Sequence, residues 1–232
     1  MNIDGKPEAS FPTMPGVRNV IFLSDREGDN FGSRIDIPPG WAGPVGGVSD
    51  ASIELFVLSG ELMLSEFNLD TNGYAYLPAG SQEYNLWTAA GAAVLYFHDE
   101  TDPNAHFRTP IINERAYDWH YAIDGVSVIL LRHAAGLGSR TWLRRITPGT
   151  SEPWELSSAV REGYLVSGEY TTSECIAGKV VSGSYRPGGY FQRPSGVLSG
   201  GPEASAVPEA VWFFREGPNA GIEYHDECTP TD

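Results

Sequence analysis

Hydrophobic residues in this chain gather in short runs of four to eight positions that are rich in Val, Ile, Leu, Phe and Tyr. Gly, Pro, Asn and Asp separate the runs, a pattern typical of β-strands joined by turns. Residues 70–73 predict a turn between strands at 62–69 and 74–77, and residues 186–189 predict a second such turn. Helix signals are weak, so many short, regularly spaced strands predict an all-β sandwich or barrel.

The pattern of the first half recurs in the second half. Six short segments match in the same order, at offsets of 106 to 117 positions. They pair 20–23 with 128–131, 32–34 with 138–140, 39–40 with 148–149, 54–61 with 162–169, 78–80 with 194–196, and 93–97 with 210–214. Ordered repeats of this kind predict a duplicated domain. We expect one barrel over residues 1–105, a linker at 106–125 and a second barrel over 126–232.

Composition and charge narrow the class of partner. The 232 residues are 41% hydrophobic, and 30 acids oppose 15 bases for a formal charge of −15. Nucleic acids and anionic membranes need a basic surface, so neither is expected as a partner. Residues 1–15 lack the apolar run of a signal peptide, and no stretch is long and apolar enough to span a bilayer. We therefore expect a cytoplasmic protein that meets a small molecule.

The two cysteines, Cys175 and Cys228, lie far apart in the sequence and form no metal-binding spacing. Free thiols in a reducing cytoplasm are the expected state, and a disulfide is the alternative. There are also only two lysines, Lys6 and Lys179, which disfavours a Schiff-base mechanism.

The order of these segments resembles the cupin superfamily, whose two motifs combine glycines, a His-x-His pair, a Glu, a Pro-x-Gly turn and a third His. The second half follows both motifs through Gly149, Glu155, Ser157, Glu162 and Gly168, and then Gly188, Pro194, Gly196 and Ser199. The first half follows more loosely through Gly40, Gly47, Ser49, Glu54 and Gly60, and then Pro78, Gly80 and Glu83. Glu54 and Glu162 stand one residue short of the general spacing, as in ChrR-like, acetylacetone-cleaving bicupins. The resemblance implies two tandem cupin barrels (double-stranded β-helix, or jelly-roll) and a homodimer.

The resemblance also implies a metal centre, held in the family by three His and one Glu. A His-x-His pair suits this role because residues i and i+2 share one face of a strand. Here the three His positions are occupied by Gly47, Ser49 and Glu83 in the first copy, and by Glu155, Ser157 and Ser199 in the second. With Glu54 and Glu162 alone retained, we expect no metal site and no cofactor.

The retained acids are candidates for acid–base chemistry. We expect Glu54 and Glu83 to point into the first barrel, and Glu155 and Glu162 into the second, where burial and mutual repulsion would separate their pKa values. The alternative is that these acids lie solvated, or paired with arginine, at a barrel mouth. His98 ends a strand near the expected first pocket, with a structural or solvent-facing imidazole as the alternative.

Other side chains are candidates for substrate binding. Arg34 and Asp36 share a strand face, as do Arg140 and Arg144. An inward arginine would bind a substrate carboxylate, whereas an outward one is surface charge, and we favour the surface. The binding candidates are Ser49, Arg34, Tyr84 and Tyr96 in the first half, and Glu155, Ser157, Glu162 and Ser199 in the second.

Three functions are compatible with this reading. The favoured one is a metal-independent isomerase, cyclase or lyase in which Glu54 works with Glu83 and His98, because the retained acids stand where cupins perform chemistry. A bicupin that binds a small molecule without catalysis is the first alternative. A metal-dependent oxygenase or hydrolase is the second, since a fold does not fix a function.

Overall fold

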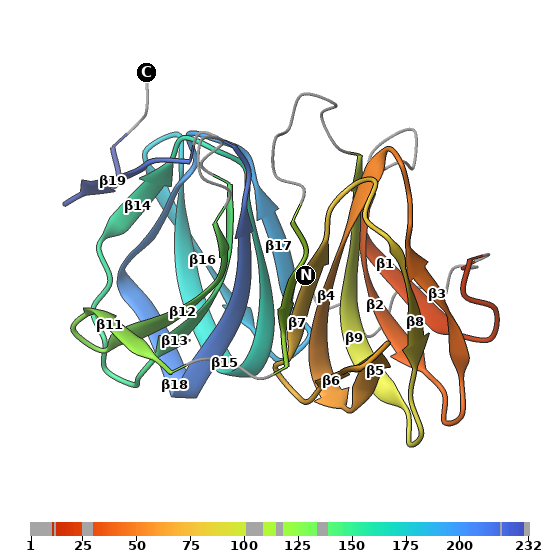
Figure 1. Ribbon diagram of the computed structural model, residues 1–232. Helices are drawn as coiled ribbons and strands as arrows, with labels where there is room; N and C mark the ends of the chain where they lie inside the picture. Colours follow the sequence, from red (N-terminus) through yellow and green to blue (C-terminus); the bar gives the residue numbers. More distant parts are fainter. Residues whose placement is uncertain are drawn as a thin grey trace. The chain divides into compact units, whose positions relative to one another are not determined.

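The computed structural model describes residue 11 and residues 13–24, 30–100, 109–114, 118–133, 139–218 and 220–229. All regular structure in these ranges is β, as predicted, and Figure 1 shows two separate sets of curled strands. The chain divides into two compact units, Gly5–Tyr117 and Asp118–Asp232. No described segment forms a helix of the length and hydrophobicity needed to cross a bilayer.

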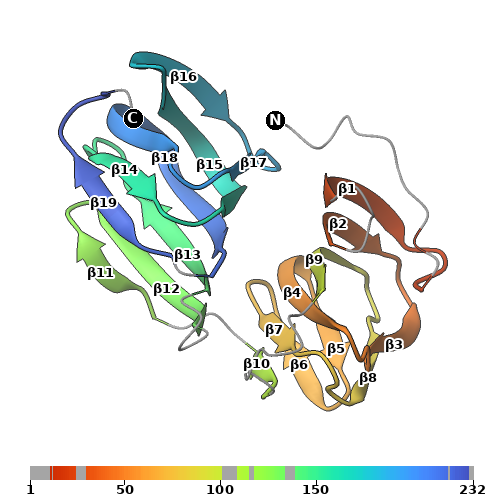
Figure 2. The ribbon, with the colours of Figure 1, turned by 90° about the horizontal axis from the view of Figure 1, so that it is seen from above.

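The first unit is built from two antiparallel sheets that curl around a shared interior (Figure 2). The larger sheet has, in spatial order, β1 (Arg18–Ser24), β2 (Phe31–Ile37), β9 (Ala92–Glu100), β4 (Ala51–Gly60), β7 (Tyr74–Leu77) and β10 (Ile111–Asn113). The smaller sheet has β3 (Ala42–Gly46), β8 (Glu83–Trp87), β5 (Leu62–Leu64) and β6 (Phe67–Leu69). One core cluster joins them, with Ile35 and Val94 from the larger sheet and Leu62 and Leu86 from the smaller.

The second unit connects its strands into one continuous ladder. Its main path runs β11 (His120–Ile123), β12 (Val126–His133), β13 (Arg140–Ile146), β18 (Leu198–Glu216), β14 (Trp154–Ser157) and β19 (Ile222–His225). The long β15 (Arg161–Ile176) pairs with β18, with β16 (Lys179–Tyr185) and with β17 (Tyr190–Arg193). Because β18 pairs with β13 near its end and with β14 near its start, one strand belongs to both walls of the barrel.

The two units repeat one pairing order. The path β1-β2-β9-β4-β7 of the first unit corresponds to β12-β13-β18-β15-β17 of the second. The predicted fold class, two tandem β-barrels of jelly-roll type, is confirmed. The segment 106–125 that we expected as a linker contains β10, which joins the first unit's sheet, and β11, which joins the second's, while the proposed boundaries themselves stay a prediction.

The local turn signals are mostly confirmed. The amide of Gly73 donates to the carbonyl of Asp70 at 2.6 Å, and that of Gly189 donates to Arg186 at 2.7 Å. The single strand expected at 62–69 is wrong, because β5 and β6 form a tight hairpin there. Its turn contains Ser65 at φ 53°, a conformation that a serine does not signal in advance as a glycine would.

The expectation of free thiols is also wrong, because Cys175 and Cys228 form a disulfide with Cα atoms 5.4 Å apart. The fold brings the end of β15 beside the segment that follows β19, although 53 positions separate the two cysteines. Disulfides persist mainly in oxidising compartments, and the cytoplasmic location that we expected stays a prediction.

The backbone conformation and surroundings of Gly168 in β15 leave no room for a side chain. Its φ is +81°, and an added Cβ would lie 2.2 Å from the carbonyl oxygen of Glu209. We expect Gly168→Ala to lower the free energy of unfolding by about 2 kcal/mol or more, measured by urea denaturation, since a backbone clash adds to an unfavourable φ. Gly183→Ala in the exposed β16 has no atom within 4 Å of its Cβ and serves as the control, within about 0.5 kcal/mol of wild type. Equal effects of the two substitutions would contradict this account.

Candidate functional site

The side chains of each barrel wall alternate between an inner and an outer face. In β4, Ile53, Leu55 and Val57 belong to the core of the first barrel, so the residues between them face the other way. In β15, Arg161 lines the inside of the second barrel and Leu165 belongs to its core. This alternation decides which of the expected site residues can meet.

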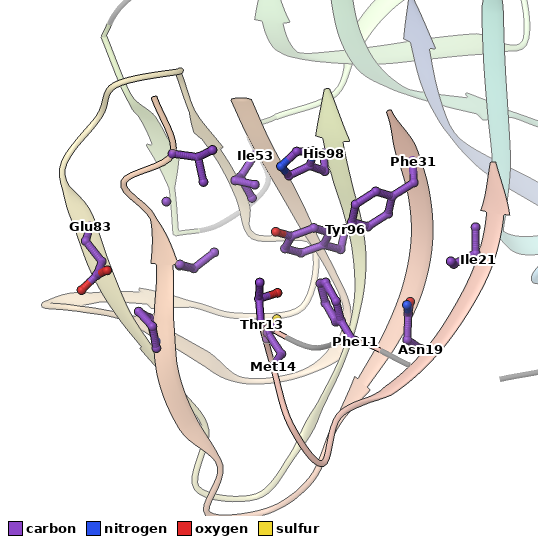
Figure 3. A pocket seen from close by; sticks show the side chains of 14 residues that line it. Phe11, Thr13, Met14, Asn19, Ile21, Phe31, Ile53, Glu83, Tyr96 and His98 are labelled. Carbon is purple, nitrogen blue, oxygen red and sulfur yellow. The ribbon is translucent and has the colours of Figure 1, made fainter. Parts of the chain in front are cut away.

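The first barrel encloses a cavity of about 460 Å³ (Figure 3). Its walls are mainly apolar, with a few polar side chains among them. The lining residues are Phe11, Thr13, Met14, Asn19, Ile21, Phe31, Pro44, Val45, Gly46, Val48, Ile53, Glu83, Tyr96 and His98. A concave apolar cavity of this size with few polar groups is typical of a small-molecule site.

His98 lies in this cavity, at the inner face of β9. Its ring stacks on Phe31 with centroids 5.3 Å apart and planes 8° apart. Tyr96, two residues earlier on the same face, has 5% of its surface exposed. Burial raises the pKa of Tyr96 well above its ordinary value, so its phenol stays protonated and acts as a hydrogen-bond donor rather than as a base.

The segment before β1 also supplies part of the lining, which the sequence analysis missed. Phe11, Thr13 and Met14 reach the cavity, and Phe11 packs edge-on against Tyr96 at 5.0 Å. The amide of Met14 donates to the carbonyl of Phe11 at 2.9 Å, which folds the segment into a turn. The spacing of buried Phe11, Met14 and Val17 in a Pro- and Gly-rich stretch was an available signal for this packing.

Glu83 lines the cavity from β8, in the smaller sheet, and its side chain is exposed. Figure 3 shows it on the opposite side of the cavity from His98. Ser49 is exposed and does not line the cavity, and Tyr84 is buried in the core instead. Of the first-half candidates, Glu83, Tyr96 and His98 therefore share one cavity.

The expectation that Glu54 points into the first barrel is wrong. Glu54 is 1% exposed, but it faces away from Ile53 and the cavity, and the hydroxyl of Tyr74 donates to its Oε1 at 2.6 Å. Glu54 stands one residue short of the general motif spacing, and a shift of one residue along a strand moves a side chain to the opposite face. The pair of acids expected from Glu54 and Glu83 is therefore not formed.

The Arg34 side chain also lies outside the first barrel. This is the surface position that we favoured for it over an inward one. Its neighbours Ile35 and Ile37 are core residues, so Arg34 occupies the other face of β2. Its Nε lies 3.2 Å from Oδ1 of Asp36, and Arg18 contacts the same carboxylate at 2.8 Å. Arg34 is thus placed away from the cavity.

In the second barrel, a buried ion-pair network occupies the interior. Nη1 of Arg161 lies 2.8 Å from Glu155, and its Nη2 lies 2.8 Å from Glu216. The hydroxyl of Ser157 donates to Glu216 at 2.8 Å, and Ser199 lies beside Glu155 on the paired strand. Glu155, Ser157 and Ser199 are all buried, so these three candidates come together, but around an arginine.

Two further arginines complete the network. Arg144 contacts Glu152 at 2.7 Å and Glu155 at 3.1 Å, and Nε of Arg140 donates to Glu216 at 2.7 Å. Three guanidinium groups thus meet three carboxylates. Arg140 and Arg144 therefore lie inside, contrary to our expectation, because these internal glutamates neutralise them.

Burial and neighbouring charges shift the pKa values of Glu155 and Arg144 within the network. Burial raises the pKa of Glu155, but Arg144 and Arg161 outweigh it and hold that pKa below its ordinary value. Burial likewise lowers the pKa of Arg144, and the neighbouring carboxylates Glu152 and Glu155 reverse the effect and raise it. Glu155 and Arg144 therefore both keep their charges at neutral pH.

Glu162 does not join the network, so the expectation that it points into the second barrel is wrong. It faces outward, as its counterpart Glu54 does, and contacts Arg215 at 3.0 Å. The space left within the network is about 30 Å³. A wider cavity of about 340 Å³ adjoins it. Arg140, Arg144, Glu155 and Arg161 line this cavity together with apolar residues that include Leu130 and Tyr224.

One row of side chains shows the contrast between the barrels. Across β2, β9 and β4, the row consists of Phe31, His98 and Ile53. Across β13, β18 and β15, the equivalent row consists of Arg140, Glu216 and Arg161. The structural counterpart of His98 is therefore Glu216, which contacts two arginines. The match of 93–97 with 210–214 in the sequence, extended by one residue, would instead pair His98 with Arg215.

The residues present do not fit the metal centre of the resembling family. The first cavity offers one imidazole, His98, and one carboxylate, Glu83, on opposite sides. In the second barrel, Glu155 and Glu216 are already engaged by arginine. Within the described ranges, no three His, Cys, Asp or Glu side chains are grouped so that they could hold an ion.

The network predicts a large effect of removing one charge. We expect Glu216→Gln to lower the free energy of unfolding by about 3–5 kcal/mol in urea denaturation, because Arg161 would keep a buried charge that is only partly compensated. Asp36→Asn, in the half-exposed ion pairs of the first unit, is the matched control and costs about 0–1 kcal/mol. A Glu216→Gln effect no larger than that of the control would mean that the network contributes little.

The lowered pKa of Glu155 predicts an acid-sensitive second barrel. A carboxylate whose pKa is lower in the folded than in the unfolded state stabilises the fold above its ordinary value of 4.5, and this contribution is lost as the pH falls through the folded value. We expect the free energy of unfolding to decrease between about pH 5 and pH 3, and Glu155→Gln to make that decrease shallower. The exposed Glu223→Gln should leave the wild-type slope unchanged, and an identical slope in both variants would contradict the assignment.

The comparison with known proteins identifies the fold of this chain but not its function. No protein-family model and no curated protein matches the sequence. Among solved structures, a candidate dioxygenase from Nostoc punctiforme is 19% identical with a TM-score of 0.76, covering 100% of this chain and 86% of its own. Protein Ylba from E. coli is 14% identical with a TM-score of 0.73, covering 93% and 89%. An oxalate decarboxylase is 10% identical with a TM-score of 0.71, covering 97% and 78%. At these identities the likeness establishes the architecture, and the chain thus folds as two tandem cupin barrels.

Proposed function

We propose that the first barrel is a small-molecule enzyme site in which His98 transfers a proton without the help of a metal. The observation that carries this proposal is the mainly apolar cavity of about 460 Å³ that contains His98, at the place where ion-paired arginines and glutamates line the second barrel. The candidate reactions are isomerisations, cyclisations or eliminations of a small organic molecule. A metal-independent isomerase, cyclase or lyase was also expected from the sequence, but with Glu54 and not His98 as the main acid–base residue.

His98 is the best acid–base candidate among the residues that line the cavity. An imidazole changes its charge near neutral pH, so it can both accept and return a proton. Stacking on Phe31 holds the ring of His98 against one wall of the cavity. In an isomerisation, His98 would take a proton from one carbon of the substrate and return it to another, which balances without a co-reactant.

Three neighbours support this role. The protonated Tyr96, two residues from His98 on the same face, can donate a hydrogen bond to an oxygen that gains charge when the proton leaves. Phe31 and Ile53, on either side of His98 in the cross-strand row, limit the access of water. The candidate dioxygenase and the oxalate decarboxylase with this fold are consistent with small-molecule chemistry in such barrels.

A binding protein without catalysis is the second candidate. The outward position of Glu54 favours it, because the expected second acid next to His98 is missing from the inner face of β4. Such a protein would use the same cavity and would leave its ligand unchanged.

The probe 5-nitrobenzisoxazole separates these functions. Its ring opens when a base removes its carbon-bound proton and the N–O bond breaks to give a cyanophenolate, which is measured by absorbance. We expect saturable turnover by the wild-type protein and a loss of about 100-fold or more in kcat/KM for His98→Gln, since general bases typically contribute this much. His120→Gln, in exposed β11 of the second unit, is the matched control and should retain wild-type turnover.

Each result has a clear consequence. Equal turnover by the His98→Gln and His120→Gln variants would remove His98 from the proposal. Saturable binding of the probe with no turnover above the buffer rate would favour the binding protein over the enzyme.

A further inference from the structure

Asn19 on β1 is the feature of the first cavity that neither the fold nor the proton transfer explains. Asn19 and Ile21 line the cavity, while Phe22 faces outward and packs on Phe97 at 5.8 Å. The Asn19 side chain is 1% exposed, and Figure 3 shows it on the cavity wall beside Phe11 and Ile21. A polar amide is therefore enclosed in a mainly apolar wall.

The amide oxygen of Asn19 is buried and has no hydrogen-bond partner within the part of the chain that the structure describes. Leaving a buried polar group unpaired destabilises a folded protein, so such groups are rare unless something satisfies them. A side-chain amide offers one acceptor and two donor positions, which match a hydroxyl or a carbonyl group.

The second barrel shows that the fold does not require an amide here. Asn19 pairs with Ile35 on β2, as Val128 pairs with Arg144 on β13. Since the two strand pairs are equivalent in the repeat, Val128 is the counterpart of Asn19. An apolar residue is thus compatible with this position, and the asparagine of the first barrel needs another explanation.

The charges around the cavity limit the ligand class. No lysine or arginine is found among the described residues that line it, and its one carboxylate is Glu83. A ligand carboxylate would lose its hydration there with no lysine or arginine to pair with and with the carboxylate of Glu83 in the same cavity, which is unfavourable. The ligand is therefore neutral and mainly apolar.

We propose that Asn19 is the specificity-determining residue of this cavity, and that it binds the hydroxyl or carbonyl group of a neutral, mainly apolar ligand. The proposal rests on the proposed function in one respect, that the first barrel holds a small molecule. Asn19 pairs with Ile35 and His98 pairs with Phe31, which are four residues, or about 13 Å, apart along β2. Asn19 therefore holds the ligand at a distance from the reacting atom and is not a catalytic residue.

Three probes of one size test this inference: naphthalene, 2-naphthol and 2-naphthoate, with dissociation constants measured by equilibrium dialysis. We expect the wild-type protein to bind 2-naphthol about threefold to tenfold more tightly than naphthalene, the range of one net hydrogen bond, and to bind 2-naphthoate most weakly. In Asn19→Leu the ratio between 2-naphthol and naphthalene should fall to about one, by the same reasoning.

Matched variants separate a ligand role from a structural one. Asn19→Val copies the residue of the second barrel, and Asn85→Leu changes an exposed asparagine of β8 that lies outside the cavity lining. We expect Asn19→Val to lose the preference for 2-naphthol, and Asn85→Leu to retain it. Because an unpaired amide is removed, the melting temperature of the Asn19 variants should rise or stay constant.

The inference is overturned if the wild-type protein shows no preference for 2-naphthol, or if the preference survives in both Asn19 variants. A lower melting temperature with an unchanged preference would assign Asn19 to the fold. His98→Gln should keep the wild-type preference, so a failed proton-transfer test would leave the inference standing, and a failed probe test would leave the role of His98 to its own experiment.

Discussion

Side chains on a β-strand alternate between two faces, and this alternation determines which residues of each barrel meet in its interior. In β4 it directs Ile53 inward and Glu54 outward, and in β15 it directs Arg161 inward and Glu162 outward. The two glutamates that matched the family motif are thus placed on the outer faces of both barrels. The chemistry of each interior depends instead on the residues one position earlier.

The inner rows give the two barrels different interiors on one backbone plan. In the second barrel, arginines and glutamates form ion pairs in the interior, and hydrogen bonds from Ser157 and Tyr170 extend the network. Buried ion pairs of this kind do not guarantee extra stability over apolar packing, but each charge depends on its partners once it is buried. Such a network fixes the geometry of its walls.

In the first barrel, the matching row of Phe31, His98 and Ile53 contains one titratable side chain and forms no ion pair among its members. The cavity that results combines one acid–base group, one protonated phenol at Tyr96 and one unpaired amide at Asn19. These groups lie on one sheet, and the pairing of its neighbouring strands sets their register. The difference between the barrels that we propose, one interior mainly apolar and the other lined by ion pairs, follows from these side chains and not from a difference in fold.

The sequence by itself determined the all-β class, the duplication and the turns at 70–73 and 186–189, because these features depend on local hydrophobic patterns and on turn residues. It also placed His98, Tyr96 and Glu83 near a pocket. Only the tertiary structure decided which way Glu54 and Glu162 face, since an error of one residue in a strand reverses the face. It alone joined Cys175 to Cys228 and brought Phe11 to the cavity, because contacts between distant segments depend on how the strands pair and pack, which the local sequence pattern does not encode.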